Sequence, residues 1–102
     1  MIKFGINSTN LCSAASAIET ALNVVFQPHE SDSRGGEYFR AETTYGTIFL
    51  QKNRDVLDDE PFEASWPIDQ LVLFFDGLDA QAWESYSERL RSLAAPTTNE
   101  LE

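Results

Sequence analysis

The run Leu71-Val72-Leu73-Phe74-Phe75, written "LVLFF", is continuously apolar. Successive side chains of a β-strand point to opposite sides of a sheet, so a strand with one wet face alternates apolar and polar residues. This run does not alternate. The pattern is typical of a central strand that is covered on both faces, or at least poorly solvated on one.

The segment that follows this run predicts a turn and then an amphipathic helix. Asp76-Gly77 favours a chain reversal, and Asp79 is a good N-cap because its carboxylate can accept a hydrogen bond from the first helical turn. Apolar residues then recur at helical spacing and give this helix one inner face. They are Ala82, Trp83, Tyr86, Leu90 and Leu93. Pro96 marks the end of the pattern.

Three further strands are predicted upstream. Residues 37–43 ("EYFRAET") and 46–53 ("GTIFLQKN") favour two strands joined by a tight turn, in which Gly46 takes the difficult dihedral angle. Residues 2–8 ("IKFGINS") alternate apolar and polar side chains, which indicates a strand with one buried face.

A first helix is predicted between the N-terminal strand and the hairpin. Ser8, Thr9 and Asn10 offer N-caps, and apolar residues at positions 11, 14, 15, 18, 22 and 25 share one helix face. Pro28 is expected to stop the helix at about residue 26. Cys12 is predicted to be a small packing residue of this helix. Residues 27–36 ("QPHESDSRGG") have the composition of a loop, which would leave His29 solvated.

These elements predict a single α/β domain of the α+β type over residues 1–96. Two helices would cover one face of a mixed sheet of about four strands, as a two-layer sandwich in the order β-α-β-β-β-α. Residues 97–102 are expected to form a flexible polar tail, and the final Leu-Glu pair resembles a cloning remnant.

The charge distribution limits the kinds of partner. The net charge is −10, and all of the excess belongs to residues 55–102, which hold twelve acids and two bases. Nucleic acids and anionic membranes are bound mainly by Lys and Arg, so we expect neither as a direct partner. No apolar stretch approaches the roughly 20 residues of a membrane span, and no secretory signal is evident, which favours a cytoplasmic location. A basic protein partner fits the sign of the charge.

Nothing in the sequence identifies a reaction. The chain has one histidine and one cysteine, and it lacks a nucleophile elbow, a phosphate-binding glycine loop and a zinc-protease motif. One cysteine allows no internal disulfide and no cysteine-rich zinc site. Residues 55–60 ("DVLDDE") do not have the spacing of a calcium loop. We therefore predict a protein that is not an enzyme, with no catalytic residue, metal or cofactor.

The segment "RDVLDDEPFEASWPID", residues 54–69, is the candidate binding site and is called the acidic loop. Its aromatic residues have two interpretations: they fill the core, or they anchor a partner that the carboxylates attract. The second helix carries two acids spaced i, i+4, which would extend the acidic surface. The predicted partner-binding residues are Asp55, Asp58, Asp59, Glu60, Phe62, Glu63, Trp66, Asp69, Glu84 and Glu88.

The middle of the chain resembles small acidic bacterial toxin-immunity proteins. The resemblance covers residues 35–75 and lies in "GGEYFRAET", "GTIFLQKNRD", "DDEPFEASWP" and "LVLFF". It implies a protein-binding inhibitor that neutralises a toxin and has no catalytic residues of its own. A nuclease is a fitting target, since a phosphate-binding cleft is positively charged.

Two alternative hypotheses stay open. The first is a DNA mimic that inhibits a nucleic-acid-binding protein, which requires acids spaced like phosphates along an extended face. The second is a structural or interaction module that assembles with itself through a sheet edge or a helix. Oligomeric state does not follow from the sequence.

Overall fold

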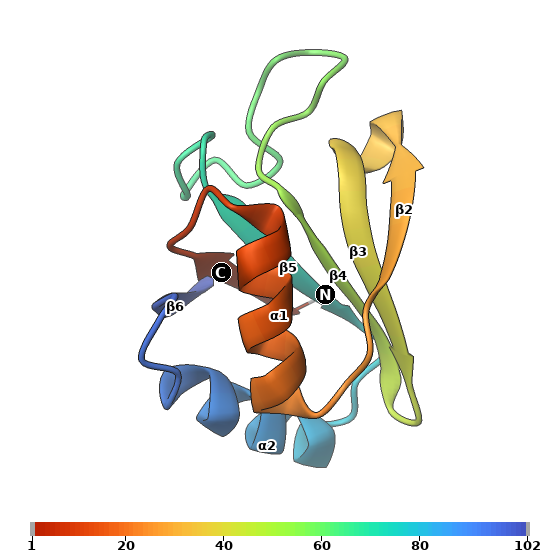
Figure 1. The fold of residues 1–102 in the computed structure, drawn as a ribbon, viewed down its shortest axis with the longest axis vertical. Helices are drawn as coiled ribbons and strands as arrows, with labels where there is room; N and C mark the ends of the chain where they lie inside the picture. Colours follow the sequence, from red (N-terminus) through yellow and green to blue (C-terminus); the bar gives the residue numbers. More distant parts are fainter. Residues whose placement is uncertain (1, 102) are drawn as a thin grey trace.

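The protein folds as an α+β domain with one six-stranded antiparallel sheet. The structure, a computed structural model, describes residues 2–101. The elements are β1 (Ile2–Ile6), α1 (Leu11–Leu22), β2 (Gln27–Ser31), the 3-10 helix η1 (Asp32–Arg34), β3 (Gly36–Thr43), β4 (Gly46–Lys52), β5 (Leu71–Asp76), α2 (Ala80–Arg91) and β6 (Thr98–Leu101). The strand order is β2-β3-β4-β5-β1-β6 (Figure 1).

Both helices pack on one face of this sheet. Ile18 and Leu22 of α1 and Leu90 of α2 share a single core with Leu50 of β4 and Phe75 of β5. The α1 helix begins at Asn10, whose Oδ1 accepts a hydrogen bond from Ser13 N at 2.9 Å. The α2 helix begins at Asp79, whose carboxylate accepts one from Ala82 N at 2.8 Å. These caps and the inner face predicted for α2 are confirmed.

The opposite face of the sheet is covered by the acidic loop. Phe49, Val72 and Phe74 point away from the helices and form a second apolar cluster, against which Phe62 and Trp66 pack. All five residues of the "LVLFF" run are therefore buried, and β5 lies between β4 and β1. The central strand covered on both faces is confirmed.

The two edge strands were missed by the sequence prediction. The predicted loop over residues 27–36 contains β2, which pairs with β3, and the predicted flexible tail contains β6, which pairs with β1. Both strands are largely exposed and polar, so neither shows an apolar period of two. Residue 102 lies outside the described part. The sheet is also antiparallel between all paired strands, not mixed.

Three smaller predictions need correction. The α1 helix ends at Leu22, before the predicted position, because Asn23 takes a left-handed conformation with φ of 55° and closes the helix. Cys12 is exposed on α1 and is not a packing residue. His29 is exposed as expected, but it belongs to β2, where its ring stacks on Tyr38 at 5.5 Å.

Candidate functional site

The acidic loop is fixed to the sheet by one buried side chain. Asn53 is fully buried, and its amide nitrogen donates hydrogen bonds to the carbonyl oxygens of Glu63, Trp66 and Pro67. Its Oδ1 accepts a hydrogen bond from Glu63 N at 2.8 Å. One side chain thus provides hydrogen-bond partners for four backbone groups of the loop. In a β-strand, such groups would be paired with the backbone of a neighbouring strand.

The loop aromatics belong to the packing of the second sheet face. The Trp66 ring lies over Gly5 of β1 so closely that a Cβ at Gly5 would be 2.4 Å from Trp66 Cδ2. Phe62 and Trp66 are each half-buried against the cluster of Phe49, Val72 and Phe74. This contact favours the core interpretation of the two rings, and it holds the loop at a defined position.

An ion pair adds a third attachment. Lys3 Nζ lies 2.5 Å from Glu63 Oε2, and Ser65 Oγ donates to Glu63 Oε1 at 3.1 Å. The hydrogen bond from Lys3 holds the pKa of the Glu63 carboxyl below its usual value of 4.5, against the opposing effect of burial. Glu63 therefore helps to hold the loop in place.

The Glu63 contact predicts a pH-dependent difference between the wild type and the E63Q variant. Because the pKa of Glu63 is lower in the folded state, the charged form stabilises the fold above the usual pKa of 4.5. We expect this stabilisation to be lost as the pH falls through the folded-state pKa. Urea denaturation at pH of about 7 and about 3 measures it. K3M, which removes the partner of Glu63, should also be less stable than the wild type at neutral pH, by a margin that shrinks on acidification. A difference in the free energy of unfolding that grows on acidification would contradict the prediction.

The tip of the acidic loop, residues 55–60, is a closed turn. Asp55 and Glu60 form an isolated antiparallel bridge in which Asp55 N donates to Glu60 O at 2.7 Å. Asp59 N donates to Asp55 O at 2.7 Å, with Asp59 in a left-handed conformation (φ 55°). Asp59 also forms an ion pair with Arg54. These contacts hold the tip in one defined shape.

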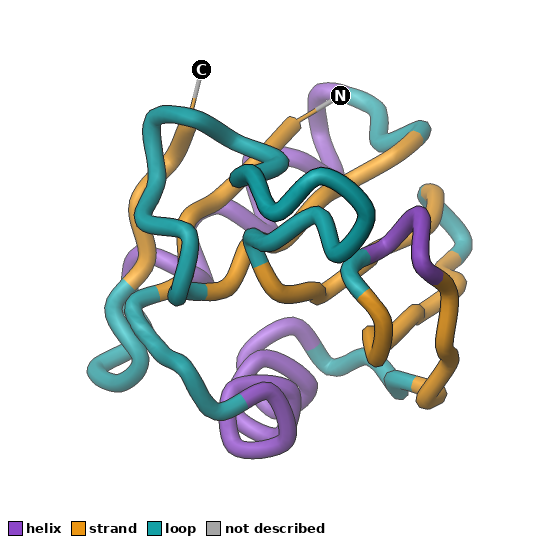
Figure 2. The backbone as a smooth tube through the Cα atoms, turned by 90° about the horizontal axis from the view of Figure 1, so that it is seen from above, coloured by secondary structure: helices purple, strands orange, loops and turns teal. Residues whose placement is uncertain are grey.

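The tip presents two apolar side chains among carboxylates. Leu57 is 70% exposed and Val56 is 46% exposed. Asp58 and Glu60 are exposed and form no ion pair within the described residues 2–101. Figure 1 shows this loop rising from the end of the sheet that is remote from α2, and Figure 2 views the molecule from above that end. An exposed apolar pair with unpaired acids beside it is a suitable contact for a basic protein.

Sequence reasoning named the aromatics and missed Val56 and Leu57. These two are the apolar residues inside the acidic run, in a segment with neither helical nor strand periodicity. The lack of a helical or strand period in the sequence was a signal that could have indicated their exposure. Residues outside helices and strands have no regular face that turns toward the core. Their exposure became evident only when the bridge between Asp55 and Glu60 placed them at a turn.

The remaining predicted site residues are not all brought together. Asp69 is exposed near the end of the acidic loop. Glu84 and Glu88 are exposed on α2, which packs on the sheet face opposite to the one that Phe62 and Trp66 cover. The acids of α2 therefore do not extend the surface of the loop tip, which rises from the end of the sheet that is remote from α2 (Figure 1).

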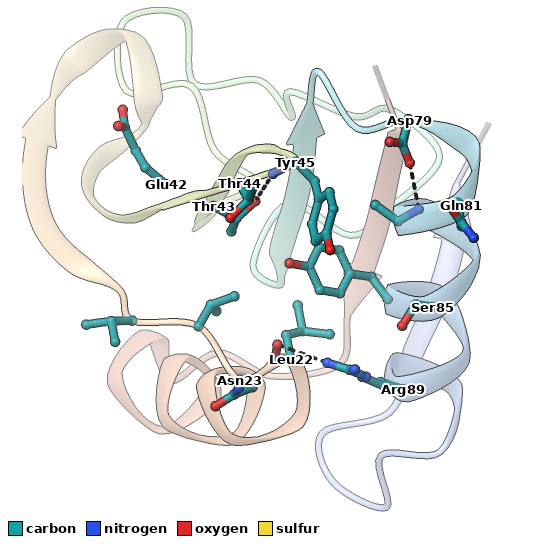
Figure 3. Close-up of a pocket in the computed structure, with 14 residues that line it drawn as sticks. Leu22, Asn23, Glu42, Thr43, Thr44, Tyr45, Asp79, Gln81, Ser85 and Arg89 are labelled. Carbon is teal, nitrogen blue, oxygen red and sulfur yellow. Dashed lines mark hydrogen bonds between the residues drawn. The ribbon is translucent and has the colours of Figure 1, made fainter.

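A hollow of about 610 Å³ lies between the end of α1, the β3–β4 turn and α2 (Figure 3). Three of its charged groups have partners: Arg89 donates to the carbonyl oxygen of Leu22, Asp79 caps α2, and Glu42 pairs with Arg40. Tyr45 is half exposed at its rim. The lining of the hollow mixes apolar side chains such as Leu22 with polar ones such as Gln81 and Ser85.

Two general properties complete the description. Within residues 2–101, no three His, Cys, Asp or Glu side chains are grouped closely enough to hold a metal ion. No helix in that range is long and apolar enough to cross a membrane.

Comparison of the chain with protein-family models, with curated proteins and with solved structures found no match.

Proposed function

We propose that this protein is an immunity-type inhibitor, which binds and neutralises a basic bacterial toxin in the cytoplasm through the tip of its acidic loop. The observation that carries the proposal is the preformed tip, where exposed Val56 and Leu57 stand beside the unpaired carboxylates of Asp58 and Glu60. The toxin would be a nuclease, because its phosphate-binding cleft carries the positive charge that these carboxylates complement.

The geometry supports each part of such a contact. The unpaired acids attract a cationic surface over a distance and raise the rate of association. Val56 and Leu57 then lose exposed apolar surface, which stabilises the complex once it has formed. Because Asn53, Trp66 and the Lys3–Glu63 pair already hold the loop, little conformational entropy is lost on binding.

The DNA-mimic hypothesis receives less support from the arrangement of charges. A DNA mimic requires a row of acids along one extended face, whereas the loop tip rises from the end of the sheet that is remote from α2 and its acids (Figure 1). Self-assembly through the exposed edges β2 and β6 has no specific observation in its favour, and the net charge of −10 opposes it.

The test compares two matched charge reversals. D58K/E60K changes the loop tip, and E84K/E88K makes the same change of charge on α2. The probe is the purified product of the gene next to the one that encodes this chain. We expect D58K/E60K to weaken binding to it by about 100-fold, mainly through slower association. E84K/E88K should bind within about threefold of the wild type, since remote surface charges act only weakly through screened solvent.

The measurement is surface plasmon resonance at low and moderate salt. Equal losses in both variants would show that general charge is responsible and would remove the loop tip as the site. No binding by the wild type would reject the product of the neighbouring gene as the target, and with it the proposed function.

A further inference from the structure

We infer that Arg34 is the centre of a second binding site, which takes a small oxyanion such as a carboxylate or a phosphate group. The site is independent of the toxin proposed above. It lies on the same sheet face as the acidic loop, because Arg34 is stacked on Phe49, which belongs to the apolar cluster of Val72 and Phe74.

The guanidinium of Arg34 is held in one orientation. Its Cζ lies 3.7 Å from the centroid of the Phe49 ring, and its Nη1 donates a hydrogen bond to Gln51 Oε1 at 3.2 Å. Gln51 is itself buried, with 1% of its surface exposed. A guanidinium has five N–H donors, so this single bond leaves the others for a ligand. Stacking on an aromatic ring preorganises the planar fork that carboxylates and phosphates bind in a bidentate manner.

The charge of Arg34 is uncompensated, in contrast to that of its neighbour. The ion pairs found within residues 2–101 are Lys3–Glu63, Arg40–Glu42 and Arg54–Asp59, and none includes Arg34. Arg40 contacts the same Phe49 ring, with Cζ at 5.7 Å from its centroid. A half-buried arginine without a carboxylate is unexpected in a chain that has ten more acids than bases. An incoming oxyanion would supply the missing partner.

Tyr38 and His29 extend the aromatic surface that begins at Phe49, the ring under Arg34. Tyr38 pairs with Gln51 in the β3–β4 register, and its ring lies 6.3 Å from that of Phe49. His29 stacks on Tyr38 from the edge strand β2. Gly35 adjoins the base of the acidic loop, because a Cβ there would lie 2.9 Å from Arg54 O. The net charge of −10 favours a ligand of low negative charge over an extended polyanion such as nucleic acid.

The experiment is an NMR titration of the full chain with sodium acetate and, separately, with inorganic phosphate. Sodium chloride keeps the ionic strength constant. We expect saturable shifts of the Arg34 side-chain N–H groups, of the Gln51 side-chain amide and of the Tyr38 backbone amide. Saturation by acetate alone identifies a carboxylate site, saturation by phosphate alone identifies a phosphate site, and saturation by both supports the shared oxyanion chemistry.

Variants separate this site from a general response to salt. R34M retains an apolar stem over Phe49 but has no charge, and it should abolish saturation by either anion. R34K keeps the charge without the planar fork, and its affinity should fall about tenfold. R91M removes an exposed arginine of α2 and serves as the matched control, with unchanged binding expected. Linear shifts in the wild type, or saturation that persists in R34M, would overturn the inference and leave Arg34 as a cover for Phe49.

Discussion

The N53A variant is expected to lose about 2–4 kcal/mol of its free energy of unfolding, since a net hydrogen bond contributes about 1 kcal/mol and buried groups left without partners cost more. Asn53 makes four hydrogen bonds to the backbone of the acidic loop from a fully buried position. Alanine offers neither donor nor acceptor. The backbone groups of Glu63 and Trp66 would then need water, which the packed loop does not readily admit.

The measurement is chemical denaturation, supported by amide hydrogen exchange. N7A is the matched control, because Asn7 is exposed and its side chain makes one hydrogen bond, to Thr97 Oγ1 at 3.2 Å. We expect N7A to stay within about 0.5 kcal/mol of the wild type. In N53A, exchange at the Glu63 amide should accelerate by more than the loss of global stability explains. Exchange of the amides of α1 should change only as much as the free energy of unfolding does. Equal stabilities of N53A and N7A would contradict the role assigned to Asn53.

The G5A variant is expected to be destabilised by about 2–3 kcal/mol, at the upper end of the range for an overpacked core. The new methyl group would lie 2.4 Å from Cδ2 of the Trp66 ring, a distance that forces the ring or β1 to move. Gly5 pairs with Val72 of β5 on one side and with Asn99 of β6 on the other, so β1 cannot move without loss of strand pairing. Trp66 is therefore expected to move, and the acidic loop with it.

A double-mutant cycle tests this explanation. In the wild-type background, W66L should destabilise the protein, because it removes apolar contacts with Phe49 and Phe74. In the G5A background, the smaller leucine relieves the clash, so W66L should be neutral or stabilising. The stabilities are compared by urea denaturation. Additive effects of the two substitutions would show that the methyl group of G5A is accommodated in another way.

The sequence was sufficient for those parts of the fold that depend on local signals. The period of 3.6 in the apolar pattern located both helices, and the caps at Asn10 and Asp79 explain where they begin. The turn before Gly46 followed from its position between two strand patterns, and the glycine has the positive φ of 147° that such a turn requires. The continuous apolar run at residues 71–75 predicted the centre of the sheet.

The edge strands depended on partners that are distant in the sequence. β2 and β6 are held by backbone hydrogen bonds to β3 and β1, and backbone pairing leaves no trace in the side-chain pattern when both faces are polar. The end of α1 was also not evident from the apolar pattern. Asn23 takes a left-handed conformation that ends the helix at Leu22, whereas the apolar pattern continues beyond it.

The sequence by itself determined the composition of the candidate site: six carboxylates and two aromatic rings in one segment, and an acidic excess confined to residues 55–102. The tertiary structure alone decided which of these groups are available. It assigned Phe62 and Trp66 to the packing, exposed Val56 and Leu57, and separated Glu84 and Glu88 from the loop tip. The physical reason is that burial and the distance between charges depend on which strand faces meet, and a linear pattern of residues does not contain that information.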